Sequence, residues 1–268
     1  MNARAIERRL RALGDRDRAK QSLRFFRTGP GEYGEGDRFL GLTVPDIRAV
    51  AREAKDSSLD TLEQLLQSPW HETRLLALVV LVEQHRRGDA VLRDAIHQLY
   101  LRNTHRINSW DLVDCSAAEI VGAHLRDEAE RGPLVRSRPT SGRATTRAPY
   151  GRRTGRPATA DRRSALLARL ARSASLWERR IAMIATLDYI KRDDFRDALR
   201  IAAILVGDGH DLIHKATGWM LREIGKRDQA AEEKFLRKYA SRMPRTMLRY
   251  AIERFPERLR RQYLAGRT

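Results

Sequence analysis

The sequence lacks most of the features that mark secreted and membrane proteins. It has one cysteine, Cys115, so no intramolecular disulfide can form, and a reducing compartment fits this composition. Its longest apolar run, residues 75–82, is much shorter than the roughly 20 residues that a membrane-spanning helix needs. The N-terminal stretch is charged and amphipathic, without the apolar core and cleavage site of a signal peptide. We therefore expect a cytoplasmic protein without a membrane anchor.

Acidic residues are scarce relative to basic ones. The chain has 53 Lys and Arg against 35 Asp and Glu, which gives a net charge of +18 over 268 residues. A protein this basic is typically bound to a polyanion, and nucleic acid is the leading candidate. A basic surface without a specific partner, and association with a ribosome or a membrane surface, are the alternatives.

Alternation of apolar and polar residues with period two is almost absent, which disfavours half-buried β-strands. Most windows instead carry apolar residues at helical spacing, as in the stripe 75–82, which ends before Gly88. Ser175 and Glu178 have the spacing of a capping box at the start of a further helix. The pattern predicts an all-α protein with many short helices.

Four helical segments resemble one another: 70–77, 110–117, 176–183 and 211–218. Aligned, they place at one equivalent position the residues Arg74, Asp114, Arg180 and Lys215, which are 40, 66 and 35 residues apart. Two of these spacings match the HEAT class of helix-pair repeats, which has a period of about 40 residues. Because such pairs bury their apolar faces only against neighbouring pairs, we expect a curved solenoid of HEAT-like repeats.

The long spacing contains a segment of different composition. Residues 131–163 include ten Arg, four Pro, four Gly and a single acid, and so carry half of the net charge. Without apolar periodicity this segment cannot form a core, and we expect it to be disordered. It would divide N-terminal repeats (1–130) from C-terminal repeats (164–268) of one continuous domain. It is either an arm that contacts phosphates or a tolerated linker.

Asp114 breaks the basic pattern of its repeat position. An Arg or Lys there is normally structural, covering apolar surface with its stem. A carboxylate at such a position must be paired with a cation or kept for chemistry. A salt bridge to an arginine such as Arg180 is the structural interpretation. Trp110, one helical turn earlier, and Trp219 in a later repeat could place aromatic walls beside it, which favours a catalytic site.

At these residues the sequence resembles the AlkD-type DNA alkylation repair family, which are DNA glycosylases built from HEAT-like repeats. The resemblance covers nearly the whole chain outside 131–163, and its most specific motifs are "NSWDLVD" and "MPRTMLRYAIE". The segments that carry it are 25–48, 107–117, 176–195 with 213–228, and 243–256. The basic insertion is the departure from the family pattern.

The resemblance implies hydrolysis of the N-glycosidic bond of positively charged N3- and N7-alkylated purines in double-stranded DNA. Trp110, Asp114 and Trp219 match the aromatic and acidic residues of the family's active cleft. Glycosylases commonly flip the target base into a pocket, but this family is understood to act without a base-flipping pocket. A monomer without an obligate protein partner is expected.

Four arginines are assigned to DNA contacts by the same resemblance. Arg180 matches a cleft arginine that contacts DNA, and weaker matches to phosphate contacts are Arg222, Arg245 and Arg249. No cofactor and no metal are expected. His210 and His214 are four residues apart but have no companion ligands in the sequence.

A carboxylate is a catalytic group suited to hydrolysis of such a glycosidic bond. An alkylated purine that already carries positive charge is a good leaving group, so no acid need protonate it. A nearby anion such as Asp114 stabilises the oxocarbenium-like sugar and holds the attacking water, as in glycoside hydrolysis. Two alternatives have no such chemistry: a non-catalytic HEAT-repeat nucleic-acid-binding protein, and a protein-binding scaffold.

Overall fold

The computed structural model describes residues 1–131 and 158–267. Throughout these residues the chain is helical, and the only β-type pairing there is an isolated bridge between Arg38 and Trp70. The prediction of an all-α protein is confirmed. Among the described helices, none is both long and apolar enough to cross a membrane.

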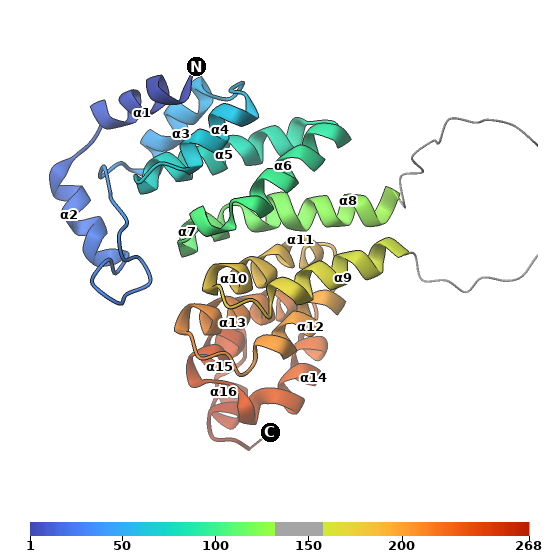
Figure 1. Cartoon of the computed structure of the whole chain (residues 1–268). Coiled ribbons are helices and arrows are strands. Elements are labelled where there is room, and N and C mark those ends of the chain that lie inside the picture. Colours follow the sequence, from blue (N-terminus) through green and yellow to red (C-terminus); the bar gives the residue numbers. More distant parts are fainter. Residues whose placement is uncertain (132–157, 268) are drawn as a thin grey trace, which may run out of the picture.

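The helices before the insertion stack in chain order (Figure 1). Helices α1, α3 and α4 pack against α5, and α5 packs against α6 and the π-helical turn η2. The elements are α1 (Ala3–Ala12), α2 (Arg16–Phe25), α3 (Val44–Glu53), α4 (Leu59–Leu66), α5 (His71–Arg87), α6 (Ala90–Arg102), η1 (Thr104–Arg106), α7 (Trp110–Asp114), η2 (Ala118–Gly122) and α8 (Ala123–Arg131).

The helices after the insertion continue the stack toward the C-terminus (Figure 1). Helix α10 packs against α12 and α13, and α13 packs against α14 and α15. The elements are α9 (Ala158–Leu170), α10 (Leu176–Ala185), α11 (Leu187–Ile190), α12 (Arg196–Leu205), α13 (Asp211–Gly225), α14 (Gln229–Tyr239), η3 (Ala240–Arg242), α15 (Arg245–Ala251), η4 (Ile252–Arg254) and α16 (Glu257–Leu264). Packing between successive helix pairs is the arrangement that a repeat solenoid requires.

The two parts join through a close approach of backbones. Helix α7 packs on α10, η2 packs on α10 and α11, and α8 packs on α9. A Cβ atom at Gly122 would lie only 2.2 Å from the carbonyl oxygen of Ala185. Glycine is therefore required at this crossing, and the repeat after the insertion docks directly on the repeat before it.

The boundaries of the insertion differ from the prediction. Residues 158–163, assigned to the insertion from composition, form the first turns of α9. The guanidinium of Arg163 is buried between Asp194 and Asp197, at 3.2 and 2.7 Å. Arg163, which composition assigned to the insertion, is therefore a buried residue that forms ion pairs within the fold. The prediction of disorder for 132–157 falls outside the described residues.

Local capping explains several helix starts. Thr43 and Asp46 form a reciprocal capping box at α3, which was not predicted. At α10 the Ser175 side chain accepts from the Glu178 backbone N–H as predicted. The Glu178 carboxylate instead accepts from the Thr104 hydroxyl at 2.8 Å. Only one of the two hydrogen bonds of the predicted capping box is therefore formed, because the Glu178 carboxylate bonds to Thr104.

Candidate active site

A cavity of about 470 Å³ opens where the stack changes from N-terminal to C-terminal helices. Its walls come from the end of α2 with the loop after it, and from α7, α10, α13 and α15. Five residues proposed from the sequence line it: Trp110, Asp114, Arg180, Trp219 and Arg222. They belong to three helices and are widely separated along the chain, so only the tertiary fold brings them together.

Asp114 is held by Arg180 in a bidentate ion pair. The Arg180 Nε donates to Oδ1 at 2.9 Å, and Nη2 donates to Oδ2 at 2.7 Å. The remaining Nη1 donates to the backbone carbonyl of Leu212 at the start of α13. Helices α7, α10 and α13 are therefore tied together at this point. Of the two outcomes left open by the sequence, an unpaired carboxylate or one paired with Arg180, the structure has the second.

The two charges differ in their access to solvent. The Arg180 residue is only 4% exposed, whereas the Asp114 side chain is 19% exposed and borders the cavity. Burial raises the pKa of the Asp114 carboxyl above its usual value, and the Arg180 guanidinium opposes that rise. The carboxylate, and not the arginine, is the member of the pair that an incoming molecule would meet.

Aromatic side chains form one wall beside Asp114. The Trp110 ring stacks on Phe26, with centroids 5.6 Å apart, and meets the edge of Phe25 at 5.9 Å. Phe25 is 66% exposed, an unusual state for a large apolar side chain. On the other side, the Trp219 indole N–H donates to Glu223 at 3.0 Å. Both tryptophans are half-buried and line the cavity.

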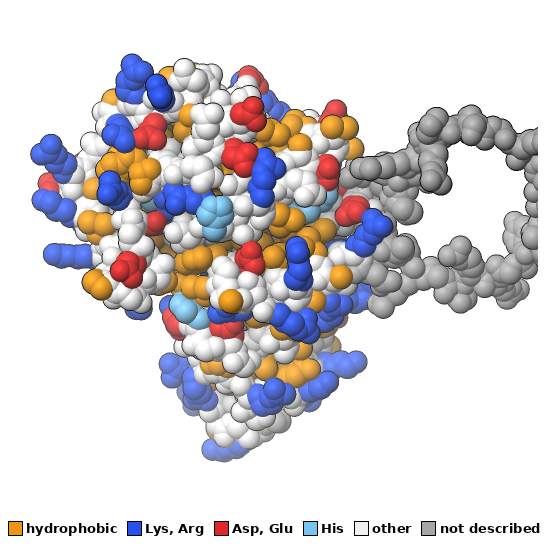
Figure 2. Space-filling model, in the orientation of Figure 1, with side chains coloured by type: hydrophobic (Ala, Val, Ile, Leu, Met, Phe, Trp, Pro, Cys, Tyr) orange, Lys and Arg blue, Asp and Glu red, His pale blue; other side chains and the backbone are white. Residues whose placement is uncertain are grey.

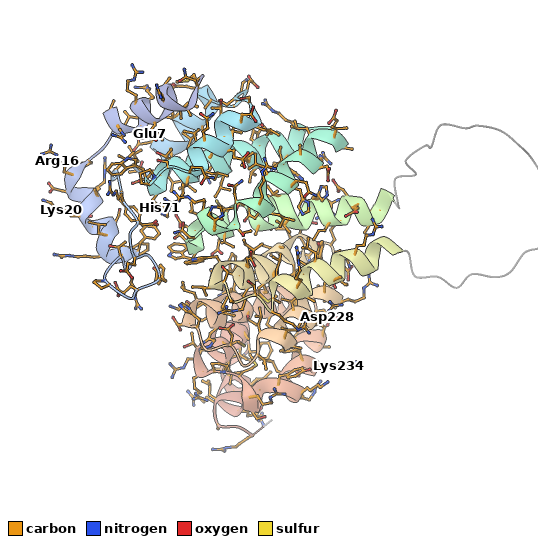
Figure 3. All side chains as sticks on the ribbon, in the orientation of Figure 1. Glu7, Arg16, Lys20, His71, Asp228 and Lys234 are labelled. Atoms are coloured by element: carbon orange, nitrogen blue, oxygen red, sulfur yellow. The ribbon has the colours of Figure 1, made fainter. Side chains whose placement is uncertain are left out.

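His71 anchors the helix that carries Asp114. It begins α5 above α7 (Figure 3), and its Nε2 lies 2.8 Å from Asp111 while Nδ1 lies 3.2 Å from Asp37. Burial works against its protonation, but the two carboxylates more than offset it and raise the pKa of His71 to about 9. Asp111, in the first turn of α7, is therefore a structural ion-pair partner of His71.

The repeat-equivalent basic residues have different roles. Arg74 is almost fully buried and donates to Asp37 at 2.8 Å, which confirms its structural interpretation. Lys215 lines the cavity and pairs with Asp211 at 2.6 Å. Arg222 also lines the cavity and pairs with Glu253.

The predicted phosphate contacts do not all reach the cavity. Arg245 and Arg249 lie on α15 and are not part of the cavity lining. Arg245 donates to the carbonyl of Leu264 at 2.7 Å. Lys and Arg side chains are also scattered over the face shown in Figure 2, on both the N-terminal and the C-terminal helices. The assignment of these two arginines to DNA contacts stays a prediction.

Three residues of the site were not singled out from the sequence. Phe25, Arg27 and Tyr33 enter the cavity from the end of α2 and the segment after it, which has few apolar residues at regular spacing. They lie in 25–48, a segment that carries part of the family resemblance, and this was the signal that could have pointed to them. The glycines of 29–36 identify this segment as a loop, but not as a further wall of a cavity. Its position depends on contacts with α5 and α7 that are distant in sequence.

Comparison of the sequence and the fold with known proteins identifies the family of this chain. A solved structure described as a predicted DNA alkylation repair enzyme from Enterococcus faecalis has the same fold, with a TM-score of 0.62 and 14% identity over 91% of this chain and 97% of that one. No curated protein matches the sequence significantly. The sequence model of the DNA alkylation repair enzyme family matches residues 6–141 and 152–255. The chain therefore belongs to the DNA alkylation repair enzyme family.

Proposed function

We propose that this protein is a monofunctional DNA glycosylase, which hydrolyses the N-glycosidic bond of positively charged N3- and N7-alkylated purines in double-stranded DNA. The observation that carries the proposal is the assembly of Asp114, Trp110 and Trp219 around one solvent-open cavity. The family membership supports a repair role, and the cavity supplies groups suited to this reaction.

Asp114 is the group that acts on the sugar. Glycosidic cleavage of a cationic purine leaves positive charge on the deoxyribose, and a carboxylate at the cavity surface stabilises that charge. Arg180 occupies two of the roughly four lone-pair sites of the carboxylate. The remaining sites can accept a hydrogen bond from the water that attacks the sugar.

The ion pair with Arg180 limits how much the Asp114 carboxylate stabilises the sugar cation. At about 4 Å and an effective dielectric near 20, a carboxylate and a sugar cation attract by about 4 kcal/mol. The Arg180 charge, placed about 4 Å further away, opposes this with about 2 kcal/mol. A net stabilisation of about 2 kcal/mol remains, which corresponds to a roughly 30-fold faster reaction.

The other residues hold the substrate. The exposed edges of Trp110 and Trp219 can pack against deoxyribose and exclude water, and their faces favour a developing cation. Lys215 and Arg222 place positive charge in the same cavity, where phosphate oxygens of the damaged strand can bind. A cation already present on the base removes the need for a general acid, so none is assigned. The absence of a base-flipping pocket is taken from the family resemblance.

A non-catalytic nucleic-acid-binding protein is the second candidate. The bidentate Arg180–Asp114 pair favours it, because a paired carboxylate can serve to fix α7 against α10 without acting on a substrate. Both candidates require DNA binding, so only product release separates them.

The decisive experiment measures free base released from duplex DNA that contains N7-methylguanine. We expect release well above the spontaneous rate for the parent protein, and a rate roughly 1,000-fold lower for Asp114→Asn, because that substitution removes the carboxylate attraction of about 4 kcal/mol and leaves the opposing Arg180 charge. The matched control is Asp211→Asn, since Asp211 lines the same cavity but is more exposed and pairs with Lys215. Its rate should stay close to that of the parent.

Three other results would count against parts of the proposal. DNA binding by the parent without release above the spontaneous rate identifies the non-catalytic candidate. Equal rates for the parent and a folded Asp114→Asn variant remove Asp114 from the mechanism. A large loss in Asp211→Asn alone would transfer the role to that carboxylate.

A further inference from the structure

A group of metal-binding side chains lies away from the cavity. Among the described residues, Asp94, His97 and His124 form the one group of three in which a ligand atom from each lies within 4.8 Å of the others. Asp94 and His97 are three residues apart on α6 and so share a face, and His124 lies at the start of α8, which packs on α6. None of the three lines the proposed active site.

His97 is buried without any hydrogen-bond partner. It is 4% exposed, and neither Nδ1 nor Nε2 is bonded. A buried polar group of this kind is unfavourable, and a native fold that retains one needs a reason such as a bound ion. The His97 ring stacks on His124 with centroids 4.0 Å apart and nearly parallel planes, so the two imidazoles lie face to face.

A further imidazole lies beside the group. The His85 ring is 6.4 Å from the His124 ring, and the Nε2 atom of His85 is likewise buried without a hydrogen-bond partner.

The charges around the group allow a cation to enter. The Asp94 side chain is 63% exposed, and its Oδ1 lies 3.7 Å from Nε2 of His124. The nearby arginines of α6 and α8 are already paired: Arg93 with Asp127 at 2.7 Å, and Arg126 with Asp188 at 2.9 Å. Their positive charge is therefore largely compensated.

We propose that Asp94, His97 and His124 form a binding site for a divalent transition metal, with zinc as the ion that fits best. Two imidazole nitrogens and one carboxylate oxygen are a three-ligand set typical of zinc, with a fourth position left for water. Such a set selects zinc or cobalt over magnesium and calcium, which require oxygen ligands.

Binding would bring the donors closer together. Metal–nitrogen distances of about 2.0–2.1 Å place ligand atoms roughly 3.3 Å apart, so the exposed Asp94 side chain turns toward the histidines. The two stacked rings also rotate out of parallel, so that one nitrogen of each faces the ion. The ion then connects α6 to α8, on the N-terminal side of residues 132–157. This link stabilises the folded state and does not depend on the proposed glycosylase activity.

The test uses the full-length protein after treatment with a chelator. Titration calorimetry with Zn²⁺ should give one ion per chain, Co²⁺ should produce visible ligand-field absorption, and Mg²⁺ should not bind. At zinc concentrations about 100-fold above Kd, the midpoint of thermal unfolding should rise by about 5–10 °C.

Variants locate the site. Asp94→Ala, which alters an exposed position and leaves the core intact, should weaken zinc binding by at least about tenfold, and His124→Ala should abolish it. Asp17→Ala is the matched control, since it removes an exposed helical carboxylate elsewhere. His214→Ala tests the other histidine pair, in which His210 and His214 already bond to backbone groups.

Retained zinc affinity in a folded Asp94→Ala variant, or loss of binding in His214→Ala, would overturn the proposal. Absence of stoichiometric Zn²⁺ and Co²⁺ binding by the parent protein would do so as well.

Discussion

The Arg180–Asp114 ion pair is the contact most open to a quantitative test, because it joins α7 to α10 across the insertion. Asp114→Asn leaves the buried Arg180 guanidinium without its counter-charge, and Arg180→Gln leaves a carboxylate whose pKa burial already raises. Each single substitution removes one partner of a pair with side-chain exposures of 5% and 19%.

The magnitude follows from that burial. Removing one partner of a buried pair costs about 3–5 kcal/mol, and the exposed edge of Asp114 places both variants at the lower end, at about 3 kcal/mol. A loss of about 3 kcal/mol lowers the unfolding midpoint of a chain of this size by roughly 6–12 °C. The double variant Asp114→Asn/Arg180→Gln should lose clearly less than the sum, because no isolated charge remains.

Urea unfolding of the parent, both single variants and the double variant gives the coupling energy directly. The control cycle uses Asp17 and Lys20, an ion pair with side chains 87% and 77% exposed, for which no measurable coupling is expected. Two results would contradict the structural role of the pair. In one, the losses of unfolding free energy in Asp114→Asn and Arg180→Gln add up to the loss in the double variant. In the other, either single variant loses less than about 1 kcal/mol of unfolding free energy.

Two further predictions concern the helices around the site. The pKa of His71 is raised to about 9 in the folded protein, above its ordinary value of 6.5, so its stabilising contribution is complete below about pH 6.5 and is lost as the pH rises toward 9. Unfolding midpoints measured from about pH 6 to 9.5 should fall in the parent, with a smaller fall in His71→Gln; equal falls would contradict the assignment. Gly218→Ala places a Cβ atom 2.4 Å from the carbonyl oxygen of Met247, so it should push α15 from α13 and destabilise by about 1–3 kcal/mol. Gly207→Ala, with open space around its Cβ position, is the control for that measurement, and equal losses in the two variants would refute the packing argument.

The all-α architecture and the positions of most helices were predictable from the sequence. Apolar residues at helical spacing identified α5, and it ends before Gly88 as expected. These features are local, since the periodicity of a helix and its capping residues are contained within a few turns. The insertion was predictable in composition but not in its C-terminal limit, because the ion pairs of Arg163 involve Asp194 and Asp197, far along the chain.

The candidate site was predictable as a set of residues but not as an arrangement. Comparison among the repeats singled out Asp114, since its charge differs from that of the equivalent residues. The sequence could not decide whether it is paired, because its partner lies 66 positions away on another helix. The loop that supplies Tyr33, and the exposed Phe25 before it, were missed for the same reason: their place depends on tertiary contacts.

The sequence by itself determined a basic, all-helical repeat protein with an acid at a position normally basic. Only the tertiary structure decided that Arg180 holds this acid, that His71 anchors its helix through Asp111, and that Arg245 and Arg249 lie outside the cavity. It also brought three possible metal ligands from α6 and α8 together. The physical reason is that apolar periodicity acts within a helix, whereas ion pairs and cavities arise where distant helices meet.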